Sequence, residues 1–184
     1  MSRLGNLDED RLSAPQRQLR EAMMKGPRGA AAAAGGPFEV WLHSPSFGLH
    51  VQSFGAHVRY GTSLAARISE LAILVCARHW DAHYEWYLHA PIAEQAGIPA
   101  PAIEALRIGA EMPLNDATDS AVYNFCRELL GRRRVPDAIY EAAAECLGEA
   151  ALVELVGLLG YYSLVALTLN AFEVLPPEPA TRLG

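Results

Sequence analysis

The sequence predicts an all-α fold with roughly six to eight helices. Apolar residues recur at three- and four-residue intervals along the chain, most clearly at positions 68, 71, 72, 75 and 76. Helix-capping residues or prolines precede these segments, and glycines follow several of them. No segment shows the sustained alternation of a strand, and no Asn-Gly hairpin signal is present.

Residues 1–36 are interpreted as an N-terminal arm, and residues 37–184 as the compact helical domain. Within the arm, a helix is predicted over 13–25, with Ser13 as its N-cap and a proline in its first turn. The segment 26–36 reads GPRGAAAAAGG, and this Gly/Ala-rich composition is typical of a mobile loop.

Start and stop signals divide the domain into further helices. Thr62 or Ser63 is expected to cap the second of these, and Asp81 to restart the next helix after a break. Gly131 is expected to end the fifth. The predicted ranges are 44–59, 64–79, 81–95, 99–108, 117–130, 136–147 and 149–172.

The charge pattern argues against a nucleic-acid partner. The formal net charge is −6, and the basic residues are scattered except for Arg132, Arg133 and Arg134, which suit a solvated helix end. The three cysteines, Cys76, Cys126 and Cys146, show neither a C-x-x-C pair nor zinc-type spacing. They are interpreted as reduced, buried thiols of a cytoplasmic protein.

Two segments bear on targeting and membranes. The N-terminus is polar and charged, so no signal peptide is expected. The apolar stretch that begins at Ala151 is interrupted by Gly, Ser, Thr and Asn, with Glu154 near its start and Glu173 near its end. It is marginal for a membrane span of ~20 residues. A buried helix in a core or at a subunit interface is the better interpretation, and no membrane partner is expected.

The stretch from Glu70 to His89 combines an apolar helical segment with a dense set of titratable side chains. Glu85 and His89 are four residues apart, so they share one face of a helix. Buried titratable groups are costly unless they are paired or used. Two carboxylates and an imidazole are the parts of a small proton relay. The alternative is a surface ion pair worth a few tenths of a kcal/mol.

Other histidines and tyrosines carry weaker signals. His79 and His83 have the spacing of a helical metal-ligand pair, with Asp81 or Glu85 as further ligands, but the expected break at Asp81 disfavours this. A surface or interface position is favoured for three histidines, His43, His50 and His57, and a cavity role is left open for one of them. Close packing is expected on the helix face of Gly157, Gly160, Tyr161 and Tyr162, from which a tyrosine could also reach a cavity.

The run Ser69-Glu70-Leu71-Ala72-Ile73-Leu74, followed by Glu85 and His89, resembles the carboxymuconolactone decarboxylase family, whose relatives include the alkylhydroperoxidase D-type peroxidases. The peroxidases carry two redox cysteines at positions that are Ala82 and Glu85 here, and Tyr84 stands where they have a relay histidine. The pattern is therefore similar to the decarboxylase branch. The resemblance covers most of the chain from residue 37 to about residue 175.

This resemblance implies an all-helical fold of the alkylhydroperoxidase D-like type that assembles as trimers, hexamers or larger rings, with active sites near subunit contacts. It also implies a cofactor-free and metal-free lyase that decarboxylates a carboxylated lactone in aromatic-compound breakdown. We assign His89 as the acid/base, Glu85 as its partner and Glu70 as the second carboxylate. The residues expected to bind the substrate are His83, Tyr84, Trp80 and Trp86.

Two other functions compete with this one. A peroxidase of the same superfamily would need a reactive thiolate, and Cys76 is the only cysteine near the motif. A non-catalytic helical oligomer or binding protein would fit if Glu85 and His89 were exposed. The partners expected from the sequence are a small-molecule substrate and further copies of the same chain.

Overall fold

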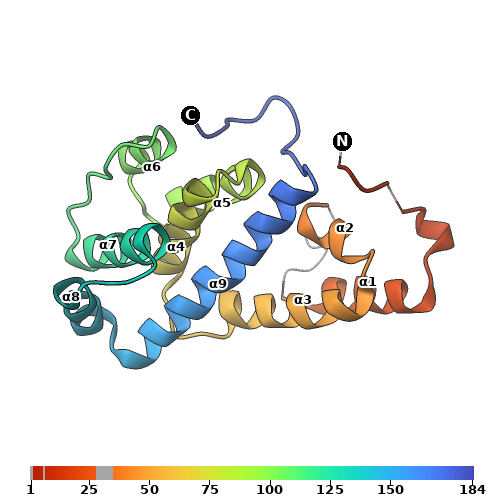
Figure 1. The fold of residues 1–184 in the computed structure, drawn as a ribbon, viewed down its shortest axis with the longest axis horizontal. Helices are drawn as coiled ribbons and strands as arrows, with labels where there is room; N and C mark the ends of the chain where they lie inside the picture. Colours follow the sequence, from red (N-terminus) through yellow and green to blue (C-terminus); the bar gives the residue numbers. More distant parts are fainter. Residues whose placement is uncertain (1, 6, 28–34) are drawn as a thin grey trace.

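The computed structural model describes residues 2–5, 7–27 and 35–184, and within these ranges the chain is helical with no strand (Figure 1). The predicted all-α class is confirmed. In the described residues, a short 3-10 helix (Glu9–Arg11) precedes nine α-helices. These are α1 (Ala14–Lys25), α2 (Pro37–Trp41), α3 (Pro45–Tyr60), α4 (Ala66–His79), α5 (His83–Gln95), α6 (Ala100–Arg107), α7 (Ala117–Arg132), α8 (Asp137–Leu147) and α9 (Glu149–Ala171).

Helix α4 lies at the centre of the fold. Every residue from Ile68 to Ala77 is buried, because α5, α7 and α9 pack around it. A helix that is covered on all sides is apolar around its whole circumference, and α4 follows this rule except at Ser69 and Glu70. Helix α9 runs across the molecule and also contacts α2, α3 and α8 (Figure 1).

Helix α1 packs against α3 and buries Leu19 and Met23 in the common core. The close approach requires Gly48, since a Cβ at that position would collide with Leu19 and with the backbone of Trp41. The segment before residue 37 therefore contributes to the core, and the proposed division at residue 36 stays a prediction. Most of the Gly/Ala-rich loop, residues 28–34, lies outside the described residues, and so does the prediction that it is mobile.

The break between α4 and α5 differs from the prediction. Asp81 is not the N-cap of α5, because its backbone is left-handed at φ 48° and its carboxylate pairs with Arg78. Ala82 precedes α5 instead, and its N–H bonds to the carbonyl of Ala77 at 2.8 Å. Helix α5 consequently begins at His83, two residues later than expected.

Two other boundaries also differ, and one helix was not predicted. Neither Thr62 nor Ser63 caps α4: Ala65 is its N-cap residue, and the N–H and hydroxyl of Ser63 both bind Glu154 of α9. Gly131 lies inside α7, which is terminated by the left-handed Arg133. The five-residue helix α2 was not predicted because it is too short to show a periodic pattern.

Within the described residues, α9 is the one helix long and apolar enough to cross a membrane by length and composition. The core helices of soluble proteins pass the same test, and Leu155, Leu158 and Val165 of α9 belong to the core. Val153 and Leu167 on other faces are exposed. Association of copies through these faces stays a prediction. Of the two glycines expected to allow close packing, Gly157 lies near Val58 of α3, whereas a Cβ at Gly160 would meet no other atom of the described residues within 4 Å.

Candidate active site

Four helices bring five polar side chains into one buried corner of the fold. The break at residues 80–82 turns the chain so that α5 packs along α4, and Glu70 of α4 meets His89 of α5. Helix α3 adds Arg59 near its C-terminal end, and α9 adds Tyr162. Glu85 lies one helical turn before His89 and faces the same way. We refer to these five residues as the polar corner.

Glu70 joins the two cationic side chains of the polar corner. One of its oxygens, Oε2, lies 2.7 Å from Nδ1 of His89, and the other, Oε1, lies 3.0 Å from Nη2 of Arg59. Glu85 Oε2 lies 3.4 Å from Nε2 of His89. The expected convergence of Glu70, Glu85 and His89 is therefore observed, while their catalytic roles stay predictions.

The carboxylates and the imidazole are almost fully buried. Glu70 and Glu85 are each 4% exposed and His89 is 5% exposed. The interpretation of Glu85 and His89 as a surface ion pair is therefore wrong. Buried charges are tolerated in proteins when they are paired and hydrogen-bonded. Two carboxylates facing an arginine and a histidine meet that condition.

The pKa of His89 is set by two opposed effects. Burial by itself lowers the pKa, because it disfavours the imidazolium. Hydrogen bonds with Glu70 and Glu85, together with their negative charges, outweigh burial and raise the pKa above the ordinary 6.5. Nδ1 donates to Glu70, since a carboxylate only accepts. Nε2 is then the ring atom that can exchange a proton with a bound molecule.

Arg59 was missed by the sequence analysis. Its Nη1 donates to the hydroxyl of Tyr162 at 2.7 Å and lies 3.2 Å from both ring nitrogens of His89. One local signal was present: Arg59 follows the buried Gly55 by four residues, so helical periodicity places it beside the buried face of α3. Its contacts with Glu70 and Tyr162 cross between helices, and no spacing rule predicts them.

A cavity of about 710 Å³ opens beside the polar corner. Arg59, Glu85, His89 and Tyr162 line it, whereas Glu70 is not among the lining residues and acts on it only through His89 and Arg59. Its volume lies within the usual range for small-molecule sites. Most of the remaining wall is apolar or aromatic and includes Phe38, Tyr60, Tyr84, Tyr87, Leu88, Ile92, Tyr161 and Val165.

Of the four residues predicted to bind the substrate, Tyr84 lines this cavity. The other three do not. Trp86 points into the core, Trp80 donates its Nε1–H to Ser163 at 3.0 Å, and His83 Nδ1 accepts from the N–H of Leu183. The register of α5 explains the positions of His83 and Trp86, because residues 84, 85, 87, 88, 89 and 92 are those of the helix that line the cavity.

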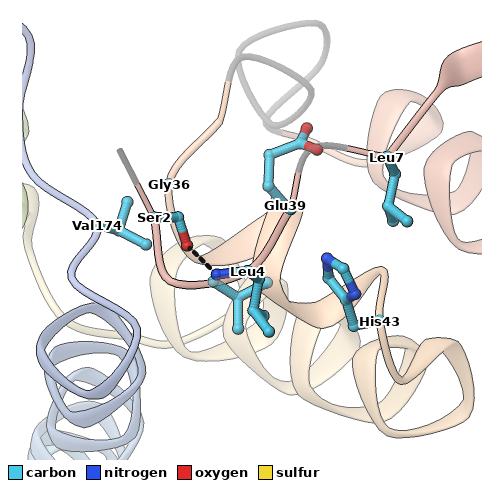
Figure 2. Close-up of a pocket in the computed structure, with 9 residues that line it drawn as sticks. Ser2, Leu4, Leu7, Gly36, Glu39, His43 and Val174 are labelled. Atoms are coloured by element: carbon cyan, nitrogen blue, oxygen red, sulfur yellow. Dashed lines mark hydrogen bonds between the residues drawn. The ribbon is translucent and has the colours of Figure 1, made fainter.

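The remaining histidines lie elsewhere. His79 ends α4 and His83 begins α5, so the break separates the proposed metal-ligand pair. Among the described residues no group of three or more side chains suited to a metal ion is found. His50 and His57 are exposed. His43 borders a small cavity of about 140 Å³ between the N-terminal segment and α2, with Glu39 nearby (Figure 2).

None of the three cysteines is suited to redox chemistry at this cavity. Cys76 is fully buried, and burial raises the pKa of its thiol to about 12. Burial also raises the pKa of the Cys126 thiol. Cys146 is exposed on α8, so the prediction that all three thiols are buried is wrong for this residue. None of the three lines the cavity beside the polar corner.

Comparisons with known proteins support the fold. Neither a scan against models of known protein families nor a search of curated proteins finds a match. Among solved structures, the chain is similar to a protein of unknown function from Agrobacterium tumefaciens, provisionally ascribed to antioxidant defence as an AhpD protein. The two share 15% sequence identity with a TM-score of 0.68, over 78% of this chain and 100% of the other. The fold is thus of the AhpD-like type, as the resemblance implied.

Proposed function

We propose that this protein is a cofactor-free lyase of the carboxymuconolactone decarboxylase type, acting on a small carboxylated lactone or a related keto acid. The observation that carries the proposal is His89, held between two buried carboxylates at the wall of a cavity. The raised pKa of His89 favours an imidazolium, which can act as a general acid.

The reaction needs one bond broken and one formed. The bond between the substrate carbon and its carboxylate breaks, carbon dioxide leaves, and the electron pair moves into the neighbouring carbonyl to give an enolate. The imidazolium of His89 then donates the Nε2 proton to the same carbon. Glu70 keeps the ring in place through Nδ1, and the imidazole regains its proton from water.

Glu85 contributes charge at the cavity wall. Its carboxylate lies near Nε2 of His89, and it stabilises the imidazolium before the proton is transferred. A carboxylate that enters a largely apolar cavity loses water, and a negative side chain nearby raises its free energy further. Loss of carbon dioxide relieves that cost, because it turns the localised anion into a delocalised enolate.

The Agrobacterium protein is provisionally ascribed to antioxidant defence, which favours a second function for this chain, a thiol peroxidase. Such an enzyme needs an accessible thiolate, normally with a lowered pKa. In this chain the thiol nearest the motif, Cys76, is buried with a raised pKa. Burial of Glu85 and His89 likewise argues against the third alternative, a non-catalytic helical oligomer or binding protein, which was expected to leave them exposed.

The test is carbon dioxide release from a panel of carboxylated lactones and keto acids. His89→Gln removes the acid, and His50→Gln, at an exposed histidine of α3, is the matched control. We expect turnover of at least one compound by the wild type and by His50→Gln, and a rate lower by about 10²–10⁴-fold in His89→Gln. An inactive wild type across the panel, or full activity in His89→Gln, would overturn the proposal.

A further inference from the structure

The hydroxyl of Tyr162 accepts a hydrogen bond within the protein, but its own proton has no acceptor among the hydrogen bonds of the described residues. Its oxygen accepts a hydrogen bond from Nη1 of Arg59 at 2.7 Å. A guanidinium can only donate, so the phenolic proton must point elsewhere. Among the hydrogen bonds of the described residues, none takes that proton. Because Tyr162 is 5% exposed and lines the cavity, a molecule bound in the cavity is the acceptor within reach.

Arg59 is held firmly behind this hydroxyl. Its Nη2 pairs with Glu70 at 3.0 Å, and its Nε donates to the hydroxyl of Tyr60 at 3.0 Å. The fixed positive charge polarises the phenol of Tyr162 and strengthens its O–H as a donor. Burial raises the pKa of Tyr162 more than Arg59 lowers it, so the phenol keeps its proton at neutral pH.

Tyr162 and His89 flank the same part of the cavity. Their rings pack edge to face with centroids 5.2 Å apart, and both side chains line the wall. A substrate carbon placed against Nε2 of His89 therefore has its neighbouring carbonyl within the region that Tyr162 borders. A donor aimed at the place where negative charge develops is a major source of rate enhancement in enzymes.

We propose that Tyr162, polarised by Arg59, donates the hydrogen bond that stabilises the enolate oxygen of the substrate. This inference rests on the proposed function. It narrows the substrate class to carboxylates with a carbonyl group placed so that the electron pair left by carbon dioxide can delocalise into it. No bond of Tyr162 is broken: its O–H bond is kept, and its hydrogen bond shortens as the carbonyl oxygen becomes negative. In this assignment Arg59 acts on the substrate through the hydroxyl of Tyr162 and is a positioning residue.

The test uses 4-nitrophenol, whose anion mimics an enolate and absorbs differently from the neutral phenol. Wild-type protein is expected to bind the anion in preference to the phenol and so to lower the pKa of the bound probe. Tyr162→Phe keeps the ring but removes the donor, and should weaken binding of the anion by roughly ten- to hundred-fold. Arg59→Lys keeps the positive charge but lacks the planar, forked guanidinium, and should weaken binding of the anion less than Tyr162→Phe does.

Tyr140→Phe is the matched control. Tyr140 is an exposed tyrosine of α8 and does not line the cavity. This variant should leave the preference for the anion unchanged. Equal anion affinity in wild type, Tyr162→Phe and Arg59→Lys would overturn the assignment. Arg59→Lys keeps the test decisive if Tyr162→Phe does not fold.

This readout does not depend on turnover. A Tyr162-dependent preference for the phenolate, with no carbon dioxide release from any compound, would overturn the proposed function and keep the assignment of Tyr162. Carbon dioxide release that is equal in wild type and Tyr162→Phe, with no preference for the phenolate, would keep the proposed function and overturn the assignment of Tyr162.

Discussion

Two buried regions lie along α4, one around Glu70 and the other around Cys76. Glu70 contacts Arg59 and His89, and both of these line the cavity. Cys76 packs toward α9, where its Sγ lies 3.6 Å from the hydroxyl of Ser163, and no cationic group lowers its pKa. The carboxylate is thus connected to a cavity by charged partners, whereas the thiol is enclosed.

The contrast between the surroundings of Glu70 and Cys76 shows which buried groups can take part in chemistry. Burial alone makes a titratable group inert, as the raised pKa of Cys76 shows. Burial with a charged partner at a cavity wall produces a poised acid or base, as for His89. An AhpD-like fold therefore does not imply thiol chemistry in this chain.

The largest expected effect is on turnover. Replacing the acid in His89→Gln should lower kcat by about 10²–10⁴-fold, because protonation of the substrate carbon then depends on water. Cys76→Ala should leave kcat within a few-fold of wild type. Both are measured as carbon dioxide release under saturating substrate. A Cys76→Ala variant as inactive as His89→Gln, yet folded, would place the thiol in the mechanism.

Glu70→Ala should destabilise the fold by about 3–5 kcal/mol, because it leaves the buried Arg59 and His89 without their shared counter-ion. Urea denaturation followed by circular dichroism measures the loss. Glu141, an exposed residue of α8, is replaced in the same way as control and should lose much less. Similar losses in the two variants would show that the polar corner adds little to stability.

The stability should also depend on pH through His89. Its pKa is raised in the folded protein, so its contribution is fully present below about pH 6.5 and is lost as the pH rises through the folded pKa. The free energy of unfolding of wild type, relative to His89→Gln, should therefore fall as the pH rises from about 6.5 through the folded pKa of His89. A difference that stays constant, or grows with pH, would contradict the raised pKa.

The smallest expected effect is that of thiol modification. In the folded protein a thiol reagent should label only the exposed Cys146, and after unfolding it should label all three cysteines. Because no thiol lines the cavity, labelled protein should retain its carbon dioxide release. Loss of activity in step with labelling of Cys146 would contradict this account.

Local patterns predicted the α4–α5 part of the site and left open a tyrosine of α9 that reaches the cavity, as Tyr162 does, but they did not predict Arg59. The spacing of Glu85 and His89, and the apolar periodicity of α4, fix which faces meet once two helices are adjacent. Arg59 and Tyr162 are 103 residues apart, and their contact depends on how α3 and α9 cross. The register of α5 was missed because Asp81 adopts a left-handed conformation instead of capping the helix.

The central claim is that His89 is a buried acid whose protonated form is stabilised by the two carboxylates. The most direct test is the pH titration of its imidazole by NMR in the wild-type protein, with Glu70→Gln as comparison. This account predicts a pKa above the ordinary 6.5 in wild type and a lower value in Glu70→Gln, where Arg59 faces the imidazolium without a shared anion. A wild-type pKa at or below 6.5, unchanged by Glu70→Gln, would contradict it.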